Sequence, residues 1–369
     1  MSYAQATIAE ARPPKKTVLV TGASGYIGFA VSRAFVRAGW HVYGVVRRAE
    51  AADTLRVEEI TPVVGAISAD LAFVDELLAR ASTRPFDVIV SCTEQIPFLE
   101  HWDHVLALLT KVAGHARQQG AAKPLVLMSS GCKDYGMTGR HGDAGLQPHT
   151  EDSPLQPMDI LKARTFCTLK VFEHSDLFDA VVLRPTPLFG YGGSYYGIIF
   201  EALRQSGGGD GNPVNVPSHP DIIYHGCHVD DCADAYVALA THPVRAEVNG
   251  ECFNISAHRY ETVSDIMAAV SAEYGIRGGI AMTPLADVRS PELHILEPVL
   301  GYTQWVDSTK IRKLTGWTDK RLLFSENLSV YRHAYDAAAR AGDAGVARIQ
   351  NRVAGWVASG IKLAKTEAE

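Results

Sequence analysis

The sequence lacks an apolar run of about 18 residues, the minimum for a membrane-spanning helix, and lacks a signal-peptide pattern. It has no run of lysine and arginine either: 41 acidic residues outnumber 35 basic ones, and the net charge is −6. We therefore expect no membrane segment, no secretion and no nucleic-acid partner. The expected partner is a small-molecule substrate, and a homodimer is one assembly that the sequence leaves open.

Cysteine is scarce as well, and the six cysteines form no Cys-x-x-Cys pair. Cys227 and Cys232 lie close to His225 and His228, which leaves a metal site as an alternative interpretation. Zinc sites usually take paired ligands from a second segment, and the sequence offers none. We therefore expect no metal, and reduced thiols in a cytosolic protein.

Short apolar runs alternate with helical stretches through the first half of the chain. The expected strands are 17–20, 40–46, 62–67, 87–91, 125–129 and 180–183, and the helices between them include 27–38, 74–81, 101–119 and 161–173. Strands that alternate with helices form right-handed βαβ units. The pattern predicts an α/β fold with a Rossmann-type, doubly wound parallel sheet.

The regular alternation is lost after Arg184-Pro185, where glycine and proline become frequent. We expect a dinucleotide-binding domain over 14–185, to which segments of about 222–256 return. A smaller, irregular substrate lobe is expected mainly over 186–330. Residues 331–369 are expected to contain a peripheral C-terminal helix.

A glycine-rich turn joins the first strand to the first helix. Gly22, Gly25 and Gly28 allow, in this order, a tight turn, close approach of a pyrophosphate, and close packing of helix on strand. The phosphates would lie at the positive end of the helix. We expect the turn to bind a dinucleotide through Gly22, Ser24, Gly25, Tyr26, Ile27 and Gly28.

The end of the second strand bears on the choice of cofactor. An NAD site usually carries an acidic residue there, whereas this sequence has Arg47 and Arg48. A guanidinium group suits a phosphate in charge and in geometry. The pattern favours NADP(H) over NAD(H), although two solvated charges at a strand end are the alternative.

The order and spacing of several short motifs resemble the extended short-chain dehydrogenase/reductase family, in its epimerase/dehydratase-like branch. The motifs are Asp70-Leu71, Ser129-Ser130 with Tyr135-Gly136, Leu183-Arg184-Pro185, the segment from His228 to Ala233, and the segment from Trp305 to Trp317. The resemblance implies that Asp70 and Leu71 border the adenine and that Cys92 and Thr93 line the cofactor. It also implies that Pro185, Thr186 and Leu188 lie beside the nicotinamide.

The family's catalytic tyrosine is missing. Where the family has Tyr-x-x-x-Lys, this chain has Met158 and Lys162, and a thioether has no proton to exchange. If Arg164 is the aligned base instead, the tyrosine position falls on Ile160. The acidic pair of the dehydratases is also replaced, by Lys133-Asp134, so the sequence does not support sugar-nucleotide dehydration.

The resemblance implies that Lys162 orients the cofactor ribose and takes part in catalysis. Ser130 and Tyr135 are the candidates for the remaining catalytic roles, and a structural tyrosine is the alternative for Tyr135. Other groups that could supply a proton are Cys132, Tyr191, Tyr195, Tyr196, His225 and His228.

These observations lead to three hypotheses. The first is an NADP(H)-binding enzyme with an atypical active site that acts on a small carbonyl or hydroxyl compound. The second is a redox-neutral isomerase or lyase on the same fold, and the third is a non-catalytic NAD(P)-sensing module.

Overall fold

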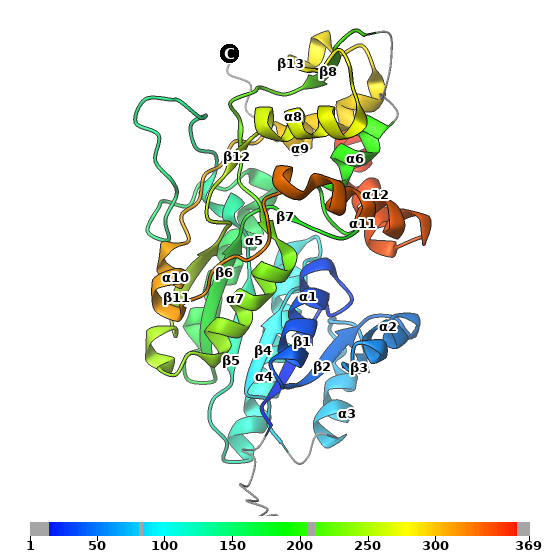
Figure 1. Ribbon diagram of the computed structural model, residues 1–369. Coiled ribbons are helices and arrows are strands. Elements are labelled where there is room, and N and C mark those ends of the chain that lie inside the picture. Colours follow the sequence, from blue (N-terminus) through cyan, green and yellow to red (C-terminus); the bar gives the residue numbers. More distant parts are fainter. Residues whose placement is uncertain (1–14, 81–83, 205–210, 360–369) are drawn as a thin grey trace, which may run out of the picture.

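The computed structural model describes residues 15–80, 84–204 and 211–359, and its centre is a seven-stranded parallel sheet (Figure 1). The strands lie in the order β11-β6-β5-β4-β1-β2-β3. Their bounds are Thr17–Thr21 (β1), His41–Val46 (β2), Thr61–Val64 (β3), Val88–Ser91 (β4), Leu125–Ser129 (β5), Asp179–Pro185 (β6) and Glu251–Ile255 (β11). The α/β fold with a doubly wound parallel sheet is thereby confirmed.

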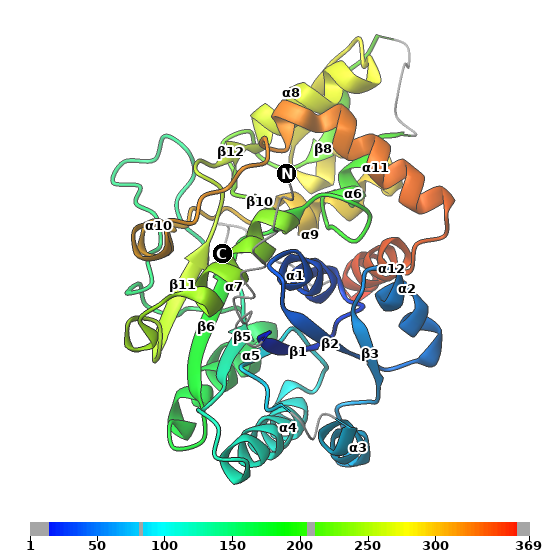
Figure 2. The same cartoon turned by 60° about the horizontal axis from the view of Figure 1, so that its bottom comes forward.

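Helices cover both faces of the sheet, as the end-on view shows (Figure 2). One face is covered by α1 (Tyr26–Arg37) and α7 (Val229–Thr241), and the other by α3 (Ala72–Arg80), α4 (Phe98–Gln118) and α5 (Asp159–Leu169). A short helix, α2 (Ala52–Val57), joins β2 to β3. Because successive strand residues point to opposite faces, Val18 and Val20 pack under α1 while Leu19 packs on the far side. All three are fully buried, as expected in a parallel sheet.

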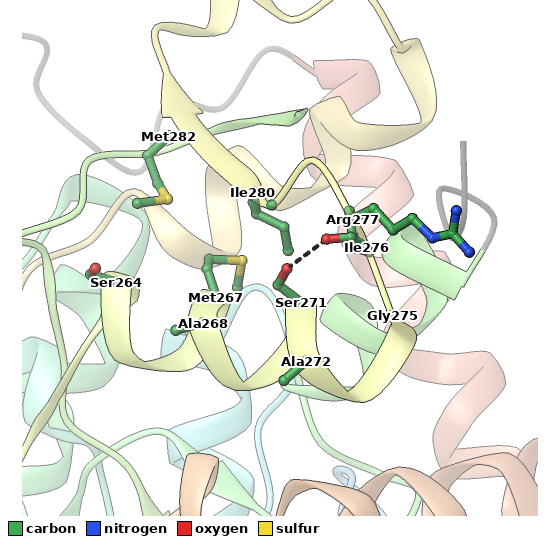
Figure 3. Close-up of a pocket in the computed structure, with 11 residues that line it drawn as sticks. Ser264, Met267, Ala268, Ser271, Ala272, Gly275, Ile276, Arg277, Ile280 and Met282 are labelled. Carbon is green, nitrogen blue, oxygen red and sulfur yellow. Dashed lines mark hydrogen bonds between the residues drawn. The ribbon is translucent and has the colours of Figure 1, made fainter. Parts of the chain in front are cut away.

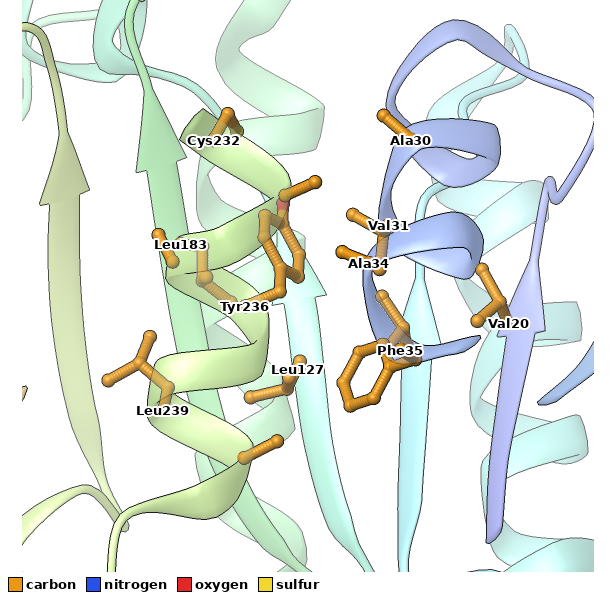
Figure 4. Packing of buried hydrophobic residues seen from close by; sticks show 14 of the residues in the cluster. Val20, Ala30, Val31, Ala34, Phe35, Leu127, Leu183, Cys232, Tyr236 and Leu239 are labelled. Atoms are coloured by element: carbon orange, nitrogen blue, oxygen red, sulfur yellow. The ribbon is translucent and has the colours of Figure 1, made fainter. Parts of the chain in front are cut away.

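The contact between α1 and α7 forms the centre of one core cluster. Tyr236 of α7 points toward Val31 and Ala34 of α1, above Leu127 of β5 (Figure 4). The hydroxyl of Tyr236 pairs with Ser129 Oγ at 2.8 Å, so this buried phenol keeps a hydrogen-bond partner. The α7 segment is thus fixed on this face of the sheet, with the Tyr236 hydroxyl at the end of β5.

Two strands differ from the sequence-based expectation. The strand expected at 62–67 ends at Val64, and the next residue, Gly65, lies under the Phe73 ring, where a Cβ would overlap the ring. The seventh strand was not predicted: β11 comes late in the chain and pairs in parallel with β6, with Phe253 opposite Leu183. It reads Glu-Cys-Phe-Asn-Ile, which is too short and mixed to be recognised by its pattern.

The remaining elements form a second group beyond the carboxyl ends of the strands. Its helices are α6 (Gly197–Arg204), α8 (Val263–Tyr274), α9 (Glu297–Leu300), α11 (Leu328–Arg340) and α12 (Ala344–Ser359), and α10 (Thr309–Thr315) packs beside β11. Its short strands are β7 (Leu188–Phe189), β8 (Val214–Pro217), β9 (Ile223–Tyr224), β10 (Cys227–His228), β12 (Glu261–Thr262) and β13 (Ile280–Thr283). No helix among the described residues is long and apolar enough to cross a membrane.

The C-terminal end holds two helices in place of the single one expected, and residues 360–369 of that expectation lie outside the described residues. The two helices pack against the glycine-rich loop that follows β7. A Cβ on Gly192 would come within 2.7 Å of Ala338 Cβ, and one on Gly193 within 2.8 Å of the Tyr26 ring. The C-terminal helices therefore border the start of α1.

Candidate active site

The glycine turn after β1 has no room for side chains at two of its three glycines. Gly22 has a φ of +69°, and a Cβ there would come within 2.7 Å of the Cys92 carbonyl oxygen. A Cβ on Gly28 would overlap the backbone of Gly22. At Gly25 the nearest atom to a Cβ is Gly22 O at 3.0 Å, so this glycine faces open space on its other sides. Gly25 thus provides a cradle that a side chain would fill.

The N-terminus of α1 is suited to an anion. Its N-cap is Gly25, no side chain caps it, and its first turn contains no acidic residue. The first N–H groups of a helix have no partner inside the helix and carry its positive partial charge. By contrast, α8 begins with a capping box made by Thr262 and Asp265. The residues present at the turn therefore fit a dinucleotide pyrophosphate.

The other residues expected at the cofactor lie at the carboxyl ends of neighbouring strands, where ligands bind in folds of this kind. Arg47 and Arg48 directly follow β2 and are exposed. Beyond β3, Asp70 Oδ1 accepts a hydrogen bond of 2.9 Å from the N–H of Ala72, next to the largely buried Leu71.

After β4, Cys92 Sγ lies 3.2 Å from Ser129 Oγ, and burial raises the pKa of this thiol to about 12, so it is neutral. Thr93 Oγ1 lies 3.0 Å from His101 Nε2. After β6, the N–H of Thr186 donates to the Ile255 carbonyl, while its buried hydroxyl has no hydrogen-bond partner among the residues that the structure describes. The structure thus brings these residues to one edge of the sheet.

The residues at the start of α5 are less enclosed. Met158 is the N-cap of α5 and is half-buried. Lys162 Nζ lies 2.6 Å from Asp159 Oδ1, and its side chain is 59% exposed. Among the described contacts, none joins Lys162 to Ser130 or Tyr135. The structure therefore does not bring the three expected catalytic residues together.

Arg164 is the charged side chain of α5 that pairs with Asp134, in the segment that follows β5. Its Nη2 lies 2.8 Å from Asp134 Oδ1 and would lie 3.4 Å from a Cβ on Gly131. Asp134 is fully buried and also accepts hydrogen bonds from Ser130, Thr165 and Arg184. Ser130 is thus held by this buried carboxylate.

Tyr135 is a buried residue of the same network. Its hydroxyl donates to Asn254 Oδ1 at 2.7 Å and accepts from Arg184 Nη1 at 2.9 Å. Burial raises the pKa of the phenol, and the ring is 1% exposed. This environment supports the alternative of a structural tyrosine.

Most of the other proton-donor candidates have partners in the fold, but the buried Tyr196 hydroxyl has none among the described residues. His225 Nε2 lies 3.1 Å from the Ala257 carbonyl, and His228 Nδ1 accepts from the N–H of Asp230. Burial lowers the pKa of each imidazole to about 4, so both are neutral near pH 7. The Tyr191 hydroxyl donates to Asp230 Oδ2 at 2.7 Å, and Tyr195 receives a hydrogen bond of 3.1 Å from Arg352 of α12.

Two residues near Gly131, the cationic Lys133 and the aromatic Tyr302, were not identified from the sequence as site residues. Lys133 is half-buried, and its Nζ lies 4.4 Å from the centre of the Tyr302 ring. Burial, together with the nearby Arg164, lowers the pKa of Lys133 to about 8. The Tyr302 hydroxyl is buried, and no described residue forms a hydrogen bond with it. The one sequence signal that could have identified Lys133 was its place in the pair Lys133-Asp134, where the dehydratases have two acidic residues.

A separate pocket of about 560 Å³ lies between α8 and β13, away from these strand ends (Figure 3). Met267, Ile280 and Met282 form much of its wall, and Ser271 Oγ donates to the Ile276 carbonyl beside it. None of the residues expected from the sequence to bind cofactor or substrate lines this pocket.

Comparisons with known proteins agree with this architecture. Residues 18–256 match the family described as the NAD dependent epimerase/dehydratase family, and the chain belongs to that family of NAD(P)-dependent enzymes. No curated protein matches the sequence.

Several solved structures share the fold. A putative epimerase from Burkholderia cenocepacia is 19% identical, with a TM-score of 0.64. The match covers 89% of this chain and 100% of the epimerase chain. The UDP-glucuronic acid 4-epimerase from Bacillus cereus, solved with UDP-glucuronic acid and NAD, is 15% identical, with a TM-score of 0.63 and coverage of 87% and 99%. The dTDP-glucose 4,6-dehydratase from Bacillus anthracis, solved with NAD, is 17% identical, with a TM-score of 0.62 and coverage of 87% and 97%.

Proposed function

We propose that this protein binds NADP(H) along the carboxyl edge of its sheet and acts on a small carbonyl or hydroxyl compound without the family's catalytic tyrosine. The observation that carries the cofactor assignment is the glycine cradle at an uncapped helix terminus, next to two exposed arginines. The structural neighbours solved with NAD support the dinucleotide. Arg47 and Arg48 support the 2′-phosphate of NADP(H), because a guanidinium pairs with phosphate.

The dinucleotide supplies hydride chemistry when it is bound, and the residues of this chain position it. The α1 terminus holds the pyrophosphate, and Arg47 and Arg48 hold the 2′-phosphate. Pro185, Thr186 and Leu188 border the nicotinamide end, where the buried Thr186 hydroxyl still lacks a partner. The role of Lys162 at the ribose stays a prediction: its exposed ammonium would have to leave Asp159.

The cofactor preference is tested by replacing Arg47 and Arg48 with alanine. Titration calorimetry should show that the unmodified protein binds NADP(H) more tightly than NAD(H), and that the double variant loses most of this difference. NAD(H) affinity should stay unchanged, which separates loss of the phosphate contact from loss of the fold. Equal affinity for the two cofactors in the unmodified protein would refute the assignment.

The role of α5 is tested by comparing Lys162→Ala with Arg164→Lys. If Lys162 orients the ribose, its replacement weakens cofactor binding, while Arg164→Lys leaves it nearly unchanged. The reverse result would assign that role to Arg164. Met158→Tyr restores a phenol at the family position and should either leave turnover unchanged or create carbonyl reduction.

A redox-neutral reaction on the same site is the second candidate. It is favoured by the burial of Tyr135 and by the absence of a tyrosine at both Met158 and Ile160. Net oxidation or reduction of the cofactor in the presence of substrate would exclude it. A homodimer and a cytosolic location stay predictions; gel filtration with light scattering tests the first.

A further inference from the structure

Cationic side chains gather where β5 ends, and their charge is only partly balanced. The cluster contains the cations Lys133, Arg164, Arg184 and Arg352 and the carboxylates Asp134 and Glu94. Cys132 adds no charge, since burial raises the pKa of its thiol to about 12. The cluster therefore has two more positive than negative charges near neutral pH.

The carboxylates in this cluster are already engaged. Asp134 is shared by two guanidinium groups, at 2.8 Å from Arg164 and 3.3 Å from Arg184, and by two hydroxyls. Glu94 lies in the field of both Arg164 and Arg352. Neither carboxylate is within ion-pair distance of Lys133 among the described residues. An ammonium without a carboxylate partner next to a guanidinium is unfavourable unless an anion joins them.

The surroundings of Lys133 leave donors for such an anion. The Lys133 ammonium is held over the Tyr302 ring at 4.4 Å, and the buried Nε of Arg164 has no hydrogen-bond partner within the described part of the chain. Gln304 fixes the short segment that carries Lys133, because its Nε2 donates to the carbonyls of Cys132 and Gly136. The two cations are thus preorganised rather than placed on flexible loops.

We propose that Lys133 and Arg164 bind an anionic group of the substrate, a carboxylate or a phosphate, at the carboxyl end of β5. This inference rests on the proposed function, because it places the substrate at the edge where the cofactor is expected. Gly131 precedes Lys133 in the same segment, and its lack of a side chain leaves space beside the Arg164 guanidinium. The substrate class is therefore a small acid or phosphate ester that carries the reacting carbonyl or hydroxyl group.

Binding of an anion should raise the pKa of Lys133, because it adds a negative charge near the ammonium. The groups that face Lys133 are Cys132 on its own segment, Arg164 of α5 and the Tyr302 ring. A rise from about 8 to ~9 lowers the neutral amine fraction at pH ~8 roughly fivefold. Competitive acetylation followed by peptide mass spectrometry measures this fraction for each lysine.

The experiment labels the full-length protein with and without acetate or inorganic phosphate, at constant ionic strength. We expect one of the two anions to protect Lys133 about fivefold, while Lys111, which is already paired with Asp75, is unaffected. The anion that protects at lower concentration identifies the substrate group. Protection by neither anion, or equal protection of Lys111, would overturn the inference.

Calorimetric titration with the more effective anion provides the second measurement. Lys133→Met should weaken its binding at least tenfold, and Lys111→Met should not. Arg164 also pairs with the buried Asp134, so at this position the variant is Arg164→Lys, which keeps a positive charge. Circular dichroism checks that this variant folds. Each titration is repeated with NADP(H): cofactor binding without anion binding refutes only this inference, whereas anion binding without cofactor binding refutes only the proposed function.

Discussion

Single residues at the glycine turn separate two consequences of adding a side chain. At Gly25 a side chain would enter the space expected for the pyrophosphate, whereas at Gly28 it would overlap the backbone of Gly22. We therefore expect Gly25 to serve the ligand, while Gly28 serves packing. The positions look alike in the sequence, and the structure distinguishes them.

Gly25→Val should abolish dinucleotide binding while the protein stays folded. The valine side chain would separate the pyrophosphate from the α1 terminus, and only one backbone atom limits its Cβ. Calorimetry measures the binding and thermal unfolding the stability. The matched control is Gly114→Ala in α4, where a Cβ meets nothing within 4 Å and cofactor binding should be unchanged. Normal binding by the valine variant would place the phosphate elsewhere.

Asp134→Ala should strongly destabilise the fold. The change leaves Arg164 and Arg184 without their buried carboxylate, and breaking a buried ion pair costs about 3–5 kcal/mol. Urea unfolding measures the loss. Asp159→Ala is the control, since that carboxylate is 93% exposed and its removal should hardly change the midpoint. Similar midpoints for the two variants would contradict the central role of Asp134.

At the scale of elements, the sequence predicts what is encoded locally. The runs ending at Thr21, Val46 and Ser91 are apolar and bounded by turn residues, so their strands are recognisable without tertiary information. The site residue Lys133 is different, because its segment is fixed by Gln304, far along the chain. Contacts between residues far apart in the chain leave no local sequence pattern. The family motif predicted Lys162, and not Lys133, as the lysine of the site.

The start of α8 offers a test of an element by itself. Thr262 Oγ1 accepts from the N–H of Asp265, and Asp265 Oδ2 accepts from the N–H of Thr262. Thr262→Ala removes one side of this capping box and should cost about 1 kcal/mol in the free energy of unfolding. Ser264→Ala, on the exposed side of the same turn, is the control and should be nearly neutral. Chemical denaturation measures both, and equal losses would show that the cap is not responsible.

The whole molecule should lose stability as the solution becomes mildly acidic. Burial lowers the pKa of His225 from 6.5 to about 4, so between these values the unfolded chain binds a proton that the folded chain does not. This contribution is complete above pH ~6.5 and is lost as the pH falls toward 4. His228, also lowered to about 4, acts in the same direction.

Urea midpoints at about pH 7.5 and 5.5 measure the effect. His225→Gln keeps a donor for the Ala257 carbonyl but cannot titrate, so its midpoint should change less between the two pH values. His141→Gln serves as the control, because that imidazole is exposed and its hydrogen-bond partner is the Tyr260 hydroxyl, so the difference should stay intact. An unchanged difference in the His225 variant would rule out this imidazole as the source.

The two ends of the described chain lie differently with respect to the sheet. Thr17 begins β1 at the amino edge, opposite the strand ends that carry the glycine turn. The C-terminal helices instead pack on the loop at Gly192 and Gly193, and a Cβ on Gly193 would meet Tyr26, the first residue of α1. For protein engineering, a fusion partner or surface anchor is therefore better attached before β1. An immobilised enzyme tethered that way would present its cofactor edge to the solution.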